Sequence, residues 1–297
     1  MASLLAVLGL LLNALVWGVS WWPFRQLEQL GVHPLWATTF IYIAASLALL
    51  VWRPSAVRYF ARYPALWVLF LAAGLANVGF NWAVTVGDVV RAVLLFYLMP
   101  AWVVVLAWPI LDERPSRASM LRLGLALCGV VVVLKSPDTP WPWPESLADY
   151  LALMGGFCFA LTNVMLRKLG DAPPFACMLA MFLGGAGLAG ATALLGMQWD
   201  VVTALPAASG EWLAWVAGLS GVFLVANYGL QYGASRLSAN AGSLVMLSEV
   251  VFASTSAVLL GAGTLTPRIV LGGSLIMAAA MLSAWSFNQQ TTHPANP

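Results

Sequence analysis

The chain has 297 residues, of which 62% are hydrophobic and only 8% are charged, and its formal net charge is +2. An average soluble domain carries roughly 25% charged residues, so this composition excludes a soluble globular protein and makes the bilayer the solvent for much of the surface. The three cysteines and two histidines show neither a disulfide framework nor the spacing of a metal site. We therefore expect no metal and no cofactor.

The first apolar run starts close to the N-terminus and ends near Trp22. It lacks a basic start and is too long for a signal-peptide core, so we predict that it is the first membrane helix. Ten segments reach the ~20 apolar residues that a spanning helix needs. None shows the alternation of a barrel strand, so we predict an all-α integral membrane protein. The predicted spans are 4–22, 34–52, 65–86, 91–110, 117–135, 147–166, 174–196, 212–232, 240–260 and 268–287.

The longest polar break is a segment rich in Pro and Trp near the middle of the chain, with five predicted helices on each side. The two halves match at an offset of 149 residues, which relates Pro100 to Glu249 and Gly124 to Gly273. An odd number of helices forces the second unit to insert upside down, which is a common plan of secondary transporters. We predict two inverted five-helix units at 1–136 and 147–287, a linker at 137–146 and a tail at 288–297.

The orientation follows from the placement of Lys and Arg. With the N-terminus in the cytoplasm, nine of the 13 fall on the cytoplasmic side and four on the other side. Cytoplasmic loops carry an excess of these residues, so we predict that both termini are cytoplasmic and that the protein is a multi-pass protein of a bacterial inner membrane.

Several short motifs resemble a known family. Trp17-Gly18 in the first helix, Pro100 in the fourth, the turn 111–114 and Gly124 resemble the signature of the ten-helix EamA branch of the drug/metabolite transporter superfamily. The resemblance covers the chain end to end. It implies a secondary transporter and not an enzyme.

The second half departs from that signature. Glu249 stands in place of the proline, and Gly261-Ala262-Gly263 replaces the acidic turn. Within the branch, the tryptophan-rich first helix and Glu249 resemble the YddG-type exporters of aromatic amino acids.

Glu249 is the single Asp or Glu well inside a predicted span. With a helix start near Asn240, it lies ~14 Å deep at 1.5 Å per residue, close to the midplane. Charged residues at that depth usually face a bundle interior or a water cavity. Glu249 is either a substrate or proton group, or a protonated acid that bonds neighbouring helices. Met246 shares its helix face.

The other candidates are polar or aromatic residues in the predicted helices 1, 3, 4, 6, 8 and 9, which we expect to form a polar cavity. Trp21 has an alternative role as an interfacial anchor, and the amides have one as interhelical bonds of ~0.6 kcal/mol each. Pro100 is predicted to kink the fourth helix. The candidate substrate-binding residues are Trp17, Ser20, Trp21, Asn77, Asn81, Tyr97, Pro100, Asn163, Asn227, Gln231, Met246 and Glu249.

These residues favour export of a small metabolite. No Lys or Arg lies deep in a predicted span, as a phosphorylated substrate would require. An ammonium could meet Glu249 and a ring could stack on Trp17, so we predict an exporter of small non-phosphorylated metabolites, with aromatic amino acids first. An exporter of organic cations or drugs is the alternative. An integral membrane enzyme is a weaker alternative, because a single deep acid provides no set of converging catalytic groups.

We expect a small-molecule substrate and membrane lipid as partners and no nucleic acid. The oligomeric state and the energy coupling stay open, with a monomer compatible with the sequence.

Overall fold

The computed structural model describes residues 2–112, 116–134, 143–234, 245–246 and 248–292. Every regular element in these ranges is helical, as the composition predicts. The elements are α1 (Ala2–Val19), α2 (Trp21–Gln29), α3 (Pro34–Trp52), the 3-10 helix η1 (Pro54–Arg58), α4 (Tyr59–Arg62), α5 (Ala65–Val86), α6 (Val89–Phe96), α7 (Met99–Leu111), α8 (Arg117–Leu134), α9 (Leu147–Lys168), α10 (Pro174–Gln198), α11 (Gly210–Ala234), α13 (Ser248–Leu259) and α14 (Pro267–Thr292).

Seven segments within the described residues are long and apolar enough to cross a membrane. Three further apolar helical stretches are shorter, because each is bounded on at least one side by residues that the structure does not describe. The seven are Leu4–Gln29, Pro34–Trp52, Ala65–Val86, Val89–Leu111, Leu147–Lys168, Pro174–Gln198 and Gly210–Leu230, and the three are Leu123–Val133, Ser248–Leu259 and Pro267–Ala279.

Local sequence signals set the helix boundaries. The bounds of α3 and α5 coincide with the predicted spans 34–52 and 65–86. His33 caps α3, because its Nδ1 accepts the N–H of Leu35 at 3.2 Å. Burial lowers the pKa of His33 to about 4, so the ring is neutral at pH 7 and its nitrogen stays free to accept. Ser146 and Asp149 form a capping box at the start of α9.

The first span is longer than predicted. After a turn at Ser20 the chain continues as α2, so helix extends to Gln29 and not to residue 22. Pro23 does not end the helix because it occupies the first turn of α2, where a missing N–H leaves no helical bond unmade. The last helix, α14, likewise runs to Thr292, past the predicted end at 287.

The fourth span is interrupted near Pro100. Its first part, α6, ends at Phe96, and α7 begins at Met99. Proline has no N–H to donate to the carbonyl of Phe96, four residues earlier. That carbonyl faces Gly156 of α9, where an added Cβ would lie 2.5 Å from the oxygen. The kink predicted at Pro100 is therefore confirmed as a break in the helix.

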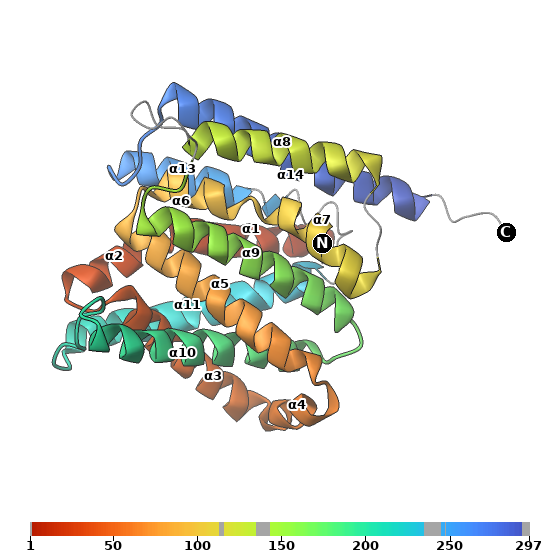
Figure 1. The fold of residues 1–297 in the computed structure, drawn as a ribbon. Coiled ribbons are helices and arrows are strands. Elements are labelled where there is room, and N and C mark those ends of the chain that lie inside the picture. The colour runs from red at the N-terminus through yellow and green to blue at the C-terminus, as the bar shows by residue number, and fades with distance from the viewer. Residues whose placement is uncertain (1, 113–115, 135–142, 235–244, 247, 293–297) are drawn as a thin grey trace.

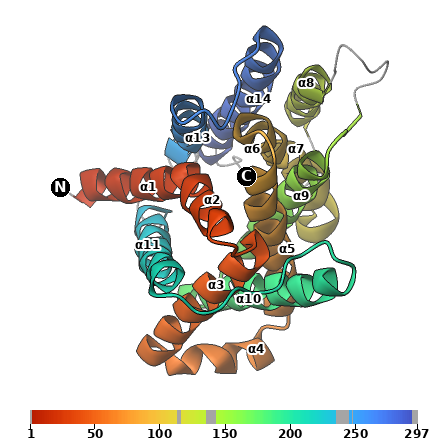
Figure 2. The ribbon, with the colours of Figure 1, turned by 90° about the vertical axis from the view of Figure 1, so that its left-hand side faces the viewer.

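The helices pack side by side in one bundle (Figures 1 and 2). Along one side of the bundle, α8 pairs with α14; toward the opposite side, α10 packs against α3 and α5. Helix α1, from the first half, packs against α11 and α13 from the second, so the two halves interleave. Large apolar side chains such as Leu47, Leu121 and Leu194 are exposed on the outside of the bundle. An apolar exterior of this kind is what a surrounding bilayer requires.

Glycines set the closest helix contacts. Helices α1 and α11 meet at Gly9 and Gly229, where a Cβ added to either would lie 2.7 or 2.8 Å from the carbonyl oxygen of the other. The small-xxx-small pair Gly229 and Gly233 thus packs within the chain, against α1.

We expect Gly229→Val to destabilise the fold by about 1–3 kcal/mol, the usual range for overpacking, because both contacting groups are backbone and neither can rotate away. Thermal unfolding of the purified variant in detergent measures the loss. Gly221→Val is the matched control, since Gly221 lies on the same helix with no atom within 4 Å of an added Cβ. Equal midpoints for the two variants would contradict the backbone contact.

Candidate functional site

Glu249 lies where three helices meet. It occupies the first turn of α13 and is 9% exposed. Its carboxyl lies close to the hydroxyl of Tyr97, which sits in the interruption between α6 and α7. On the other side α1 approaches at Gly18, where an added Cβ would lie 2.8 Å from the carbonyl oxygen of Glu249. Two predicted site residues far apart in sequence, Tyr97 and Glu249, are thus brought together.

The predicted helix start near Asn240 lies outside the described residues, as do 241–244 and 247, whereas 245–246 and α13 from Ser248 are helical. The depth of Glu249 within its span therefore stays a prediction.

A row of aromatic rings leads to this carboxyl. The ring of Trp17 lies 4.8 Å from that of Phe223 on α11 and 6.3 Å from that of Phe80 on α5, measured between centroids. Phe80 lies 4.7 Å from Phe96, which lies 6.2 Å from Tyr97. Trp17 also contacts all three hydrophobic clusters of the bundle. It is a central residue, as the cavity interpretation of the sequence expects.

Asn77 and Asn81 of α5 form hydrogen bonds with α3, a helix that was not among those predicted to line the polar cavity. The Tyr42 hydroxyl donates to Asn77 Oδ1 at 2.6 Å, and Asn81 Nδ2 donates to Thr38 Oγ1 at 3.0 Å. Both partners lie on α3, so these bonds are of the interhelical kind that the sequence leaves open as the alternative role of the amides. Thr38 and Tyr42 are four residues apart on one helix face, and this spacing was the signal that could have found them.

The side-chain amides of Asn163 and Asn227 donate hydrogen bonds to backbone carbonyls of their own helices. Asn163 Nδ2 donates to the Phe159 carbonyl at 3.0 Å and lies 3.9 Å from Met99 Sδ. Asn227 Nδ2 donates to the Phe223 carbonyl at 2.9 Å. Each bond joins residues i and i−4, which leaves the amide oxygen as the group that can contact something else.

Ser20 and Trp21 have structural partners. The Ser20 hydroxyl donates to the Trp17 carbonyl at 2.8 Å, within the turn between α1 and α2. Trp21 is 3% exposed and its Nε1 donates to Ser256 Oγ at 3.0 Å, which ties α2 to α13. Trp21 is therefore a buried interhelical contact, and its alternative role as an interfacial anchor is wrong.

The side chains of two predicted site residues, Pro100 and Gln231, lie outside the described part of the structure, although both residues are helical. Met246 is partly buried. The structure therefore neither joins Pro100 and Gln231 to the group around Glu249 nor removes them from it.

Asn13 is a buried polar side chain outside the predicted substrate-binding set. Asn13 lies one turn before Trp17 on α1 and is 1% exposed. Neither its Oδ1 nor its Nδ2 has a hydrogen-bond partner in the structure. A buried amide with both groups unpaired is unusual, so Asn13 is a further candidate for contact with a bound solute or water.

An ion pair also joins the two halves. Arg91 on α6 holds Asp149 on α9 through two parallel bonds, Nε to Oδ1 and Nη2 to Oδ2, both at 2.8 Å. The sequence does not predict this pair, because 58 residues separate the two partners. Asp149 thus has two roles, as a helix cap and as a partner of Arg91.

Comparison with known proteins gives a fold and a partial family match. No curated protein matches the chain. A solved structure titled only "Crystal structure of protein" is similar to it, with a TM-score of 0.60 and 18% sequence identity over 98% of this chain and 99% of that one. Residues 4–135 match the EamA-like transporter family, whose members are membrane transporters of the drug/metabolite transporter superfamily. That match covers less than half of this multi-pass helical membrane protein.

Proposed function

We propose that this protein is a secondary transporter that exports small non-phosphorylated metabolites by alternating access, with aromatic amino acids as its first candidate substrates. The observation that carries the proposal is the buried carboxyl of Glu249, close to Tyr97 at the end of the aromatic row that begins near Trp17. Buried ionisable groups in a membrane bundle are costly and usually functional. The carboxyl suits an ammonium group, and the rings suit an aromatic side chain or a cation.

We further propose ten crossings in two inverted units, at 1–136 and 147–287, joined by the linker 137–146. In this assignment α1 with α2 forms one crossing and α6 with α7 another. One backbone feature repeats at the offset of 149 that relates Pro100 to Glu249. The left-handed residues Asp112 and Gly261, with φ 57° and 67°, follow α7 and α13.

This arrangement supports a substrate site at the interface of the two units. Discontinuous helices in inverted-repeat transporters commonly place their inner ends near the midplane, where they bind substrate and coupling ions. The start of α7, Glu249 of α13 and Trp17 of α1 would contribute to such a site. The Lys and Arg bias supports an orientation with both termini in the cytoplasm of a bacterial inner membrane.

An exporter of organic cations is the second candidate, and it rests on the same carboxyl beside aromatic rings. Recognition of quaternary ammonium ligands commonly uses aromatic faces with a nearby anion. The two candidates differ in their need for a carboxylate on the substrate. An amino acid requires amide or hydroxyl donors for that carboxylate, and an organic cation does not.

Uptake into proteoliposomes tests the proposal directly. The panel comprises tryptophan, phenylalanine, leucine, glutamate, a quaternary ammonium compound and a sugar phosphate, each with and without an imposed pH gradient. We expect the aromatic amino acids to be transported fastest and the sugar phosphate not to exceed protein-free vesicles. Preference for the quaternary ammonium would select the second candidate, and preference for the sugar phosphate would refute both. A pH gradient that accelerates uptake would assign proton coupling.

A further inference from the structure

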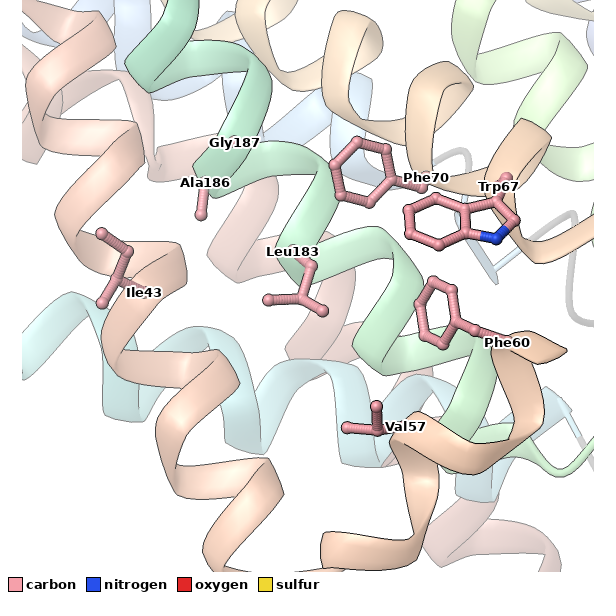
Figure 3. Close-up of a pocket in the computed structure, with 8 residues that line it drawn as sticks. All are labelled: Ile43, Val57, Phe60, Trp67, Phe70, Leu183, Ala186 and Gly187. Atoms are coloured by element: carbon pink, nitrogen blue, oxygen red, sulfur yellow. The ribbon is translucent and has the colours of Figure 1, made fainter.

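An apolar groove opens between α3, α5 and α10 (Figure 3). It has a volume of about 450 Å³. Its lining side chains are aliphatic or aromatic and come from α3, η1, α4, α5 and α10, among them Ile43, Val57, Phe60, Phe70 and Leu183. None of these helices carries Trp17, Tyr97 or Glu249, so the groove is distinct from the candidate substrate site.

The groove faces the lipid. Ile43, Val57 and Trp67 on its walls are exposed large hydrophobic side chains. Exposed apolar walls on a membrane helix bundle contact hydrocarbon, so the solute that fills such a groove is apolar along its length. The volume lies in the range of ~300–1,000 Å³ that holds a small molecule. An acyl chain meets both requirements.

Positive charge lies at one end of the groove. The segment from Arg53 to Arg62 forms part of its wall through η1 and α4 and contains three arginines and no acidic residue. The arginines are exposed, and Arg58 and Arg62 form no hydrogen bond or ion pair with any residue in the described ranges. Basic clusters at the ends of membrane helices bind anionic lipid head groups.

Aromatic side chains mark this end as the membrane interface. Trp52 and Trp67 are exposed beside the segment, and the guanidiniums of Arg53 and Arg62 lie over the rings of Trp52 and Tyr63 at 5.0 and 5.8 Å. Trp and Tyr concentrate at the head-group level of the bilayer. Arginine can lay its stem along apolar surface there and keep its charge among the phosphates.

We propose that this groove is a specific site for one anionic phospholipid. One acyl chain fills the space between α3, α5 and α10, and the phosphate is held by Arg58 and Arg62. The apolar groove suits an acyl chain, and the arginines at its interfacial end, which form no ion pair with described residues, favour an anionic head group. The proposal does not depend on the substrate or on the transport mechanism.

Native mass spectrometry of the purified full-length protein tests the charge requirement. The protein in a neutral detergent is titrated with phosphatidylglycerol or with phosphatidylcholine of the same acyl chains. We expect tighter binding of phosphatidylglycerol, and a loss of about fivefold in its affinity for each arginine removed, or ~25-fold in Arg58→Gln/Arg62→Gln. Binding of phosphatidylcholine should not change. Arg117→Gln/Arg122→Gln removes two other charges from the predicted cytoplasmic side and is the matched control.

A second pair of variants tests the groove itself. Ile43→Trp should fill it and remove the tightest phosphatidylglycerol adduct, whereas Leu47→Trp, one turn along α3 and outside the groove, should leave that adduct in place. Where Arg58→Gln/Arg62→Gln does not fold, Arg58→Lys/Arg62→Lys keeps the charge and should bind phosphatidylglycerol within a fewfold of the unmodified protein. Equal affinity for the two lipids, or full phosphatidylglycerol binding in Ile43→Trp, would overturn the proposal.

Discussion

Glu249→Gln is expected to fold and insert normally and to transport poorly. The substitution keeps the size of the side chain and its capacity to hydrogen bond to Tyr97. It removes the negative charge that would meet a substrate ammonium. A charged hydrogen bond contributes ~1.5–3 kcal/mol, so the apparent affinity should fall roughly 10- to 100-fold. Initial rates of uptake at limiting substrate, in proteoliposomes with equal protein content, measure the loss.

Two companion variants separate a functional from a structural role. Tyr97→Phe removes the hydroxyl that lies close to the Glu249 carboxyl and keeps the ring in its row. If the contact only holds the helices together, Tyr97→Phe should lower the thermal midpoint, Glu249→Gln should not, and both variants should leave substrate affinity unchanged. Glu211→Gln, in the first turn of α11 and exposed, is the control for loss of a first-turn carboxylate. Near-normal uptake by Glu249→Gln would leave Trp17 and Asn13 as the better candidates.

A proton-carrying role for Glu249 has its own signature. Glu249→Gln would then abolish the response to an imposed pH gradient, while substrate binding measured at equilibrium would persist. A facilitator would show no response to the gradient in the unmodified protein either. The comparison of the two proteins with and without the gradient therefore assigns the coupling.

Arg91→Met is expected to be among the most destabilising single substitutions outside the helix contacts. It leaves the Asp149 carboxylate, whose side chain is 3% exposed, without its guanidinium partner. Removing one member of a buried pair typically costs 3–5 kcal/mol. We expect about 3 kcal/mol, the lower end of that range, because the backbone N–H groups of Glu145 and Ser146 still donate to the carboxylate. Thermal and chemical unfolding in one detergent give the difference.

A double-mutant cycle identifies the cause of that loss. Arg91→Met/Asp149→Asn removes both charges, so it should be more stable than Arg91→Met alone. Arg91→Lys keeps the charge and loses the two parallel bonds, so it should fall between the unmodified protein and Arg91→Met. Arg117→Met removes an exposed arginine and is the control. Additive effects of the two single substitutions would contradict the ion pair.

Much of the fold was predictable because the bilayer imposes a simple rule. A backbone in hydrocarbon must form its N–H to C=O hydrogen bonds within the protein, so a long apolar segment becomes a helix irrespective of the segments packed around it. The spans 34–52 and 65–86 therefore match α3 and α5 to the residue. The extension of the first span to Gln29 was missed, because whether Pro23 ends a helix depends on whether it falls in a first turn.

The candidate site was only partly predictable. The sequence singled out Glu249 and Tyr97 separately, one as a rare acid in a span and the other as a polar aromatic residue. Their proximity required the structure, because it joins α13 to the break after α6. The spacing of Thr38 and Tyr42 places them on one face of α3, but only the structure shows that their partners are Asn81 and Asn77 on α5.

The sequence by itself determined that the chain is an all-helical membrane protein and where the uninterrupted apolar runs lie. These properties are local, because they depend on the composition of each segment. Only the tertiary structure decided which helices of one half contact the other, that Arg91 holds Asp149, and that Asn13 is buried without a partner. Those facts depend on packing between helices in a solvent that is as apolar as the side chains themselves. Hydropathy therefore cannot distinguish a buried helix face from a lipid-facing one. Small residues and polar pairs decide which faces pack together, and they act between residues far apart in the sequence.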